Sequence, residues 1–312
     1  EIFVGKALKK YPRDSFYLAS KLPMGQIDSY ERGMEIFRHQ FEKLQVEYID
    51  FYMFHGINKE VFDEKILKFG LLDEMIRMKE AGKIRNLGFS FHGSYEDFAY
   101  ILNYRDWDFC QIQYNYMDTD IQAGDRGVAL AAERKVPLII MEPVKGGSLA
   151  SFAPAAEQIF KDYAPEKSLA SWAVRWVAAH PGVAVVLSGM STEEQVRDNL
   201  DTFNHYVPLT EEEQKVIDRV IEAIRGSIRN GCTGCAYCMP CPFGVDIPRN
   251  FAIWNEYGMY NNAERTKENL ARLDAEKWAD KCRACGKCEK ACPQALPIRE
   301  DLKRMFAEVS AL

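Results

Sequence analysis

Short apolar runs alternate with helical patterns from residue 15 to about residue 207. Six of these runs have the length and composition of buried strands: Phe16–Lys21, Tyr48–His55, Ile84–Ser90, Phe109–Asn115, Val136–Pro143 and Val183–Met190. A helix with one buried face is predicted between the first two runs, because apolar side chains recur there at steps of three and four: Tyr30, Met34, Phe37, Phe41 and Leu44.

This alternation of strands and helices predicts a parallel sheet of the α/β class. The regular spacing of the runs favours a (β/α)8 TIM-type barrel. Six strands do not close such a barrel, so either the sheet is open and doubly wound or two strands precede Glu1. The residues at the strand ends decide between these interpretations.

Composition sets broad limits on the class of protein. The chain has 312 residues, of which 47% are hydrophobic and 28% charged, as is typical of a soluble protein with a large and a small domain. Its net charge of −6 gives no general reason to expect nucleic-acid or membrane partners. The most apolar span, residues 168–187, contains Arg175, His180 and Pro181, which predicts a core helix and a strand instead of a membrane crossing.

Eight of the nine cysteines lie within residues 232–292, in two sets that are each followed by proline. The first set is Cys232, Cys235, Cys238 and Cys241, and the second is Cys282, Cys285, Cys288 and Cys292. Three cysteines at this spacing can each reach a different iron of one cubane, and the fourth commonly ligates the other cluster. We therefore predict two [4Fe–4S] clusters with crossed ligation. One is held by Cys232, Cys235, Cys238 and Cys292, and the other by Cys241, Cys282, Cys285 and Cys288.

Structural zinc and disulfides are the alternatives for these cysteines. Zinc sites usually use paired Cys-x2-Cys hooks, and disulfide frameworks suit small secreted chains. The first set spaces its last cysteine by two residues, where the bacterial ferredoxin run has three. Thiolates that bind clusters indicate a reducing, cytoplasmic setting.

The cysteines define a second domain. A polar-faced helix over residues 210–229 leads into it, and Gly226 to Gly231 marks the boundary. We expect a barrel domain over residues 1–225 and a ferredoxin-type domain over residues 226–312. The charged insert at residues 261–281 has a helical pattern, so the small domain is predicted to be mainly helical.

Polar side chains stand at consecutive strand ends. Lys21 ends the first run, His55 the second and Ser90 the third, and the fourth carries Gln111. In a barrel, catalytic groups come from the carboxyl ends of the strands. Taken singly, Lys21 could be a solvated strand-end charge and His55 a core histidine. In this order, the four side chains predict a functional rim.

These residues and their neighbours resemble an aldo/keto reductase over residues 1–205. The matching motifs, in chain order, are Ser20-Lys21, Asp50-Phe51-Tyr52 with His55, Gly82-Lys83-Ile84-Arg85 before Gly88-x-Ser90, Gln111-x-x-Tyr114-Asn115, and Gly189-x-Ser191 with Gln195 and Asn199. With the cysteine domain attached, the whole chain resembles the iron–sulfur-containing aldo/keto reductases of bacteria and archaea.

The resemblance implies roles for individual residues. The family's catalytic set is Asp, Tyr, Lys and His, and Lys21 and His55 match the last two. The family's Asp and Tyr are expected ahead of Glu1. Ser90 and Gln111 match residues that hold the nicotinamide carboxamide. The adenosine end of the dinucleotide would be held by Gly189, Ser191, Gln195 and Asn199.

Three departures from the family pattern concern the dinucleotide. Phe91 stands where a carboxamide-binding Asn is usual, and Met141 where an aromatic ring commonly stacks on the nicotinamide. Gly189 and Gln195 stand where basic residues often clamp the 2′-phosphate, so NADP is not specified over NAD.

The sequence therefore predicts an oxidoreductase that reduces a small carbonyl-type substrate, with NAD(P) and two clusters for electron transfer. Clusters pass single electrons and nicotinamide passes a hydride, so a flavin could serve as adapter, although no flavin fingerprint is present. A redox partner protein is a further expectation. Two alternatives stay open: a nicotinamide-dependent reductase with purely structural clusters, and a non-catalytic electron carrier or redox sensor on a degenerate barrel.

Overall fold

The computed structural model describes residues 1–312, which divide into two compact units. One unit comprises residues 1–143 and 173–208, and the other comprises residues 144–172 and 209–312. The helix α8 (Leu169–Ala178) crosses the division. The domain boundary predicted between residues 225 and 226 falls in the last turn of α10 (Glu211–Gly226), a helix that belongs to the second unit.

The first unit is built on one parallel sheet of six strands in the order β1-β2-β3-β4-β5-β6. The strands are β1 (Ala19–Leu22), β2 (Ile49–Ile57), β3 (Ile84–Phe91), β4 (Phe109–Gln113), β5 (Leu138–Met141) and β6 (Val183–Val186). Each lies within or overlaps one predicted run, so the predicted parallel α/β sheet is confirmed. Consecutive strands are neighbours throughout, as in a TIM-type fold.

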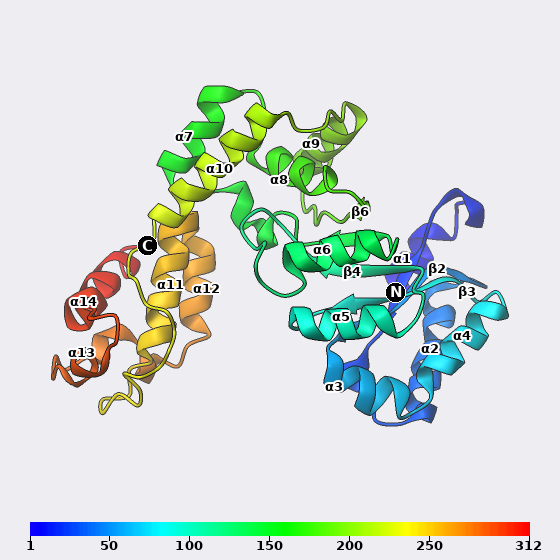
Figure 1. The fold of residues 1–312 in the computed structure, drawn as a ribbon, viewed down its shortest axis with the longest axis horizontal. Helices are drawn as coiled ribbons and strands as arrows, with labels where there is room; N and C mark the ends of the chain where they lie inside the picture. Colours follow the sequence, from blue (N-terminus) through cyan, green and yellow to red (C-terminus); the bar gives the residue numbers. More distant parts are fainter. The chain divides into compact units, whose positions relative to one another are not determined.

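Helices follow the strands and cover one face of the sheet (Figure 1). The helices of this unit are α1 (Ile2–Leu8), α2 (Tyr30–Leu44), α3 (Lys59–Val61), α4 (Leu71–Glu80), α5 (Tyr95–Tyr104), α6 (Gly124–Glu133) and α9 (Glu193–Asn204). The predicted amphipathic helix is α2, whose Ser29 hydroxyl caps its first turn by accepting from the Arg32 backbone N–H. Gly82 follows α4 with a φ of +75°, the left-handed conformation expected after a helix.

Alternate residues of each strand point to opposite faces of the sheet. On the helix-covered face, Tyr52 packs edge-on against Phe37 of α2, and its hydroxyl donates to Gln40. Phe54 and Phe89 both pack against Trp107 on the same side. On the other face Met53, Phe109 and Ile139 form a separate core, with Phe51 packed against it. Both faces of the sheet are thus apolar through its middle.

The second unit is mainly helical, as predicted for the cysteine domain. It contains α7 (Pro154–Tyr163), α10, α11 (Ile247–Tyr260), α12 (Ala263–Ala271), α13 (Lys287–Ala291) and α14 (Ile298–Val309). The predicted helical insert consists of α12 and two short 3-10 turns, Ala275–Lys277 and Ala279–Lys281. A core that includes Phe251, Trp254 and Leu302 joins α11 to α14, which lie side by side in Figure 1.

None of the helices is both long and apolar enough to span a membrane. The apolar span at residues 168–187 forms α8 and β6, as predicted from its interrupting polar residues.

Candidate functional site

Strand register brings the predicted rim residues onto one face of the sheet. Lys21 pairs in register with Met53, Met53 with Gly88, and Gly88 with Phe109. Registered neighbours in a sheet point to the same side, so Lys21 shares its face with the core of Met53 and Phe109. Gly88 has no side chain because an added Cβ would lie 2.5 Å from the Phe109 carbonyl oxygen. The close approach of β3 and β4 at this point therefore requires glycine.

Lys21 is half-buried, and no carboxylate of the chain pairs with it. Burial lowers the pKa of its ammonium group, because the charged form is less well solvated there than in water. An unpaired cation at the carboxyl end of a strand can stabilise negative charge that develops beside it.

His55 lies where the register of β2 against β3 shifts, between Phe54 and Ile57, and Gly56 takes a left-handed φ of +62°. Such irregularities re-aim side chains at strand ends. Burial lowers the pKa of the His55 imidazole, and the nearby charges of Lys21 and His92 act in the same direction. Lys21 and His55 thus lie near enough for their charges to interact, and burial favours the neutral imidazole, whose ring N–H can donate a hydrogen bond.

Ser90 lies two residues beyond Gly88, and Gln111 two residues beyond Phe109, so both face the same side of the sheet as that pair. Ser90 and Gln111 are direct register partners. Ser90 is fully buried, and its hydroxyl has no hydrogen-bond partner within the chain. The Gln111 amide donates to the Met141 sulfur over 3.2 Å, which is a weak interaction that a better acceptor can replace. A buried hydroxyl without a partner beside an amide fits the carboxamide of a nicotinamide ring.

Gln113 is a polar residue of this face that the sequence did not single out as a site. Its amide nitrogen donates to Asp118 over 2.9 Å, while its carbonyl oxygen is buried without a partner. Asn115 donates to the same carboxylate over 3.1 Å. The alternation of β4 could have identified Gln113, because it lies two residues beyond Gln111 and therefore points to the same side.

The segment predicted to hold the adenosine end forms the loop before α9 and its first turns. Gln195 is engaged in a capping box: its carbonyl oxygen accepts from the Ser191 and Thr192 backbone N–H groups. The Asn199 amide donates to the Ser188 hydroxyl over 3.0 Å, and its carbonyl oxygen is buried without a partner. Gly189 is exposed, with open space where a side chain would be. Within this set, Asn199 is therefore the residue whose side-chain carbonyl oxygen is buried and available to accept a hydrogen bond.

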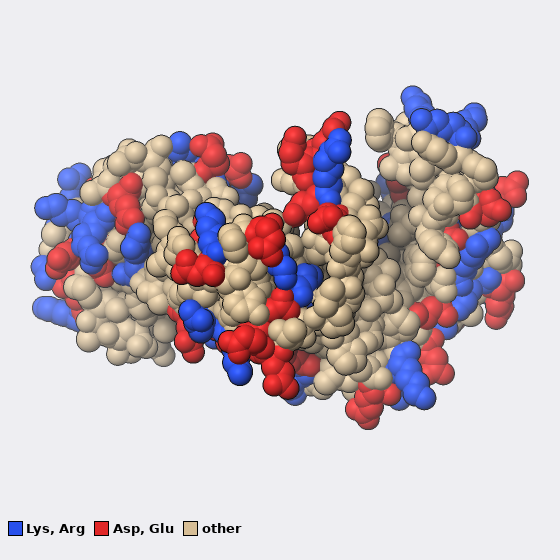
Figure 2. Space-filling model, turned by 90° about the horizontal axis from the view of Figure 1, so that it is seen from above, with Lys and Arg blue, Asp and Glu red and all other residues tan.

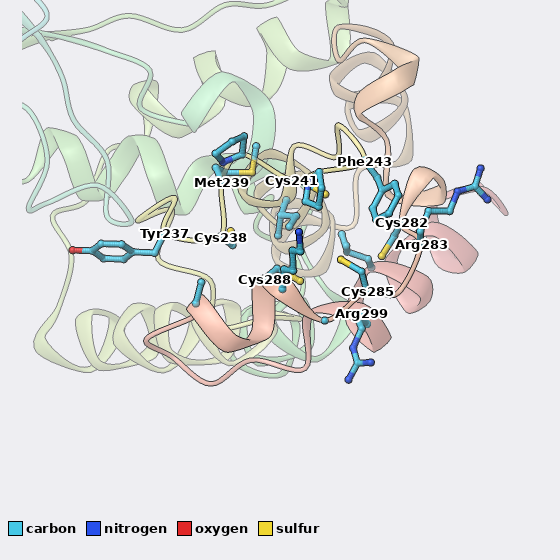
Figure 3. A pocket seen from close by; sticks show the side chains of 17 residues that line it. Tyr237, Cys238, Met239, Cys241, Phe243, Cys282, Arg283, Cys285, Cys288 and Arg299 are labelled. Carbon is cyan, nitrogen blue, oxygen red and sulfur yellow. The ribbon is translucent and has the colours of Figure 1, made fainter.

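In the second unit the eight cysteines surround two adjacent pockets. The first cysteine site is lined by Cys232, Cys235, Cys238 and Cys292. The second cysteine site is lined by Cys241, Cys282, Cys285 and Cys288, together with Cys238 from the neighbouring site (Figure 3). Residues far apart in the sequence thus meet at each site, in the combinations that crossed ligation requires.

The two cysteine turns have the same backbone conformation. In the first turn the residues on either side of Cys235 are left-handed, Gly234 at φ +73° and Ala236 at +60°. In the second turn the same holds around Cys285, with Ala284 at +52° and Gly286 at +74°. Alternating right- and left-handed residues turn successive N–H groups inward and form the concave nests found at iron–sulfur sites.

Each cysteine site is a pocket lined by at least four cysteines. No group of three or more potential ligands in the chain is placed to hold a single metal ion. A tetrahedral zinc site would bring thiolates to about 2.3 Å from one ion. Cys232, Cys235, Cys238 and Cys292 line the same pocket; burial raises the pKa of the Cys238 thiol, and the other three cysteines act in the same direction. The donor set fits a polynuclear cluster with one thiolate on each iron.

Fold and cysteine sites together define a parallel α/β protein joined to an iron–sulfur domain. Residues 1–222 match the aldo/keto reductase family, and residues 231–296 match the 4Fe-4S dicluster domain. The chain therefore belongs to the aldo/keto reductase family, and it is an oxidoreductase that carries an iron–sulfur domain.

Curated relatives agree with this assignment. An aldo-keto reductase of Mycolicibacterium vanbaalenii is 25% identical over 233 residues, covering 72% of this chain and 76% of the relative. The NADH-specific methylglyoxal reductase of Escherichia coli is 21% identical over 268 residues, covering 72% of this chain and 80% of the relative.

Solved structures share the fold of the first unit. The holo form of aldo-keto reductase AKR11C1 from Bacillus halodurans matches with a TM-score of 0.58 at 24% identity, covering 70% of this chain and 77% of that one. An aldo/keto reductase from Klebsiella pneumoniae in complex with NADP and acetate matches with a TM-score of 0.57 at 21% identity, covering 70% and 75%.

The proximity of Lys21 and His55 can be tested by titration. We expect the His55 imidazole to titrate below the usual pKa of histidine, and its pKa to rise in the Lys21→Met variant because a neighbouring positive charge is removed. In the unaltered protein the His55 pKa is lower in the folded than in the unfolded state, so the unfolded chain binds more protons. The contribution of His55 to the stability of the fold is therefore present above the ordinary pKa of histidine and is lost as the pH falls. NMR titration of the histidine ring protons, assigned with a His55→Gln variant, measures the pKa. An unchanged value in Lys21→Met would contradict the arrangement.

Proposed function

We propose that the first unit reduces a small carbonyl compound with a nicotinamide dinucleotide, and that two [4Fe–4S] clusters in the second unit exchange electrons with this reaction. The observation that carries the proposal is the row of Lys21, His55, Ser90 and Gln111 along the carboxyl ends of four neighbouring strands. The two cysteine sites support the second part. Thiolate ligation of clusters also favours a reducing compartment, the cytoplasm.

When bound, the nicotinamide supplies a hydride and each cluster holds a single electron. Reduction of a carbonyl to an alcohol consumes two electrons and two protons: the hydride brings both electrons and one proton, and an acid supplies the other proton. Clusters, which pass one electron at a time, would replace these two electrons through a two-electron adapter such as a bound flavin. His55, held neutral, would donate a hydrogen bond to the substrate oxygen and so polarise the carbonyl. The half-buried charge of Lys21 would stabilise the negative charge that develops on that oxygen.

Ser90 and Gln111 would orient the nicotinamide ring. The Ser90 hydroxyl lacks a partner, and the Gln111 amide has only the Met141 sulfur, so both can hydrogen-bond a carboxamide without breaking a strong interaction. Gly189, Ser191, Gln195 and Asn199 would hold the adenosine end. Among these, the unpartnered carbonyl oxygen of Asn199 is suited to accept from an exocyclic amine.

For the clusters, we propose the crossed ligand sets. Cys232, Cys235, Cys238 and Cys292 would hold one cluster, because they line the same pocket and their sulfurs are neighbours. Cys241, Cys282, Cys285 and Cys288 would hold the other. Cys238 and Ile247 line both pockets, so the two clusters would share a wall and could pass electrons between them.

The role of Ser90 is tested by the Ser90→Ala variant. We expect dinucleotide binding to weaken about ten-fold, the value of one buried hydrogen bond, without loss of thermal stability, because the hydroxyl has no partner in the chain. Titration with NADH and NADPH, followed by fluorescence, measures the binding. Ser148→Ala is the matched control, since the Ser148 hydroxyl is equally buried and unpartnered but lies in the second unit. Equal binding by both variants and the unaltered protein would contradict the proposed contact.

Crossed ligation is tested with two pairs of cysteine substitutions. In Cys235→Ala/Cys292→Ala both lost ligands belong to one proposed cluster, so we expect about four irons of the original eight to remain. In Cys235→Ala/Cys241→Ala each proposed cluster loses one ligand, so both clusters should be damaged. Iron analysis and absorbance after anaerobic preparation measure the difference. Sequential ligation within each set would give the opposite result.

The complete proposal is tested on the complete protein, purified without oxygen. With NADH and methylglyoxal as the probe carbonyl, we expect His55→Ala to turn over roughly a hundred-fold more slowly, as for the loss of one polarising donor. His39→Ala is the control, because His39 lies on the exposed face of α2.

Cluster absorbance in the same samples tests the electron transfer. Clusters that are reduced chemically should be reoxidised when methylglyoxal is added. If turnover proceeds and the clusters stay reduced throughout, they are structural and the electron-transfer part of the proposal is wrong. If no carbonyl is reduced while the clusters still cycle, the chain is an electron carrier instead.

A further inference from the structure

The two cysteine sites differ sharply in charge. Besides its cysteines, the first cysteine site is lined only by uncharged side chains, among them Thr233, Ile247, Phe251 and Leu296. The second cysteine site has three basic side chains in its lining and no acidic one. These are Arg283, Lys287 and Arg299, which we call the basic rim.

The basic rim is exposed and only partly neutralised. Arg299 forms an ion pair with Glu289, with its Nε 2.8 Å from a carboxylate oxygen. Arg283 and Lys287 form no ion pair within the chain, and both are exposed. In Figure 3 the guanidinium groups of Arg283 and Arg299 project away from the cysteines. Figure 2 shows several Lys and Arg side chains on the exposed surface of the second unit.

Cluster stability does not explain these cations. A four-iron cluster with four thiolates is negative in either site, yet the first cysteine site has no charged residue in its lining. The basic rim also opposes the sign of the whole chain, whose net charge is −6. Unpaired cations grouped on one exposed edge are suited to contact with a negatively charged surface.

We infer that the basic rim is a docking surface for an acidic one-electron carrier protein, and that electrons enter or leave the protein through the second cysteine site. This rests on the proposed function, in which the clusters transfer electrons. In the reducing direction the carrier loses one electron and the cluster held by Cys241, Cys282, Cys285 and Cys288 gains it. The wall that both sites share at Cys238 and Ile247 gives the electron a short way onward.

Oppositely charged surfaces speed the encounter of two proteins, and salt weakens the effect. The probe is a plant-type [2Fe–2S] ferredoxin, chosen for its small size and acidic surface. Calorimetric titration of the oxidised holoprotein at low and high ionic strength measures binding, which does not depend on turnover. We expect Arg283→Glu/Lys287→Glu to bind the probe at least about ten-fold more weakly at low salt.

Arg219→Glu/Arg225→Glu is the matched control. It changes the net charge by the same amount on two exposed residues of α10 that form no ion pair and line neither cysteine site. We expect it to bind the probe nearly as well as the unaltered protein. Stopped-flow reduction of the clusters by the reduced probe should slow in parallel with the loss of binding. Complete bleaching by titanium(III) citrate should be the same in all variants, which verifies that the clusters are intact.

Equal weakening in both double variants would mean that only net charge matters, and would overturn the inference. Absence of binding by the unaltered protein at low salt would overturn it as well. Failure of the proposed function is a separate result: the probe would then reduce the clusters normally, but a carbonyl substrate would not reoxidise them.

Discussion

The parallel hydrogen-bond register of the sheet is the constraint on which the candidate active site depends. It sets Lys21 beside Met53, Gly88 beside Phe109 and Ser90 beside Gln111, so polar groups from strands far apart in the sequence share one face. A shift of one residue in any strand would move its polar group to the helix-covered face. The contact of Gly88 with the Phe109 carbonyl and ring resists such a shift, because only glycine allows β3 and β4 to approach so closely.

In the second unit, helices instead of strands bring residues from distant parts of the sequence together. Its two cysteine turns are about forty residues apart, yet they must face each other across two pockets. The core of α11 and α14 holds them there, and partly buried cysteines of both turns pack against it. A buried hydrogen bond from the Asn230 amide to Asp301 ties the start of the first turn to α14. The matching left-handed residues around Cys235 and Cys285 then turn both backbones inward.

The two cysteine sites share a backbone conformation but differ in the charge of the side chains around them. The same backbone turn is surrounded by uncharged side chains at one site and by the basic rim at the other. Ligand chemistry alone needs no such contrast, whereas the proposed exchange of electrons with another protein accounts for it, because complementary charge steers the encounter of two proteins.

The sequence by itself determined the six strands, the helical cysteine domain and the rim positions of Lys21, His55, Ser90 and Gln111, since these follow from hydrophobic period and local spacing. Only the tertiary structure decided that Gln195 caps α9 and that the Ser90 hydroxyl lacks a partner. The tertiary structure also decided the contrast in charge between the two cysteine sites. Arg283 and Arg299 are sixteen residues apart in the sequence, and the packing of α14 makes both part of the lining of one pocket. Local patterns encode which face a residue takes. Which side chains satisfy one another depends on contacts between segments that the sequence does not place side by side.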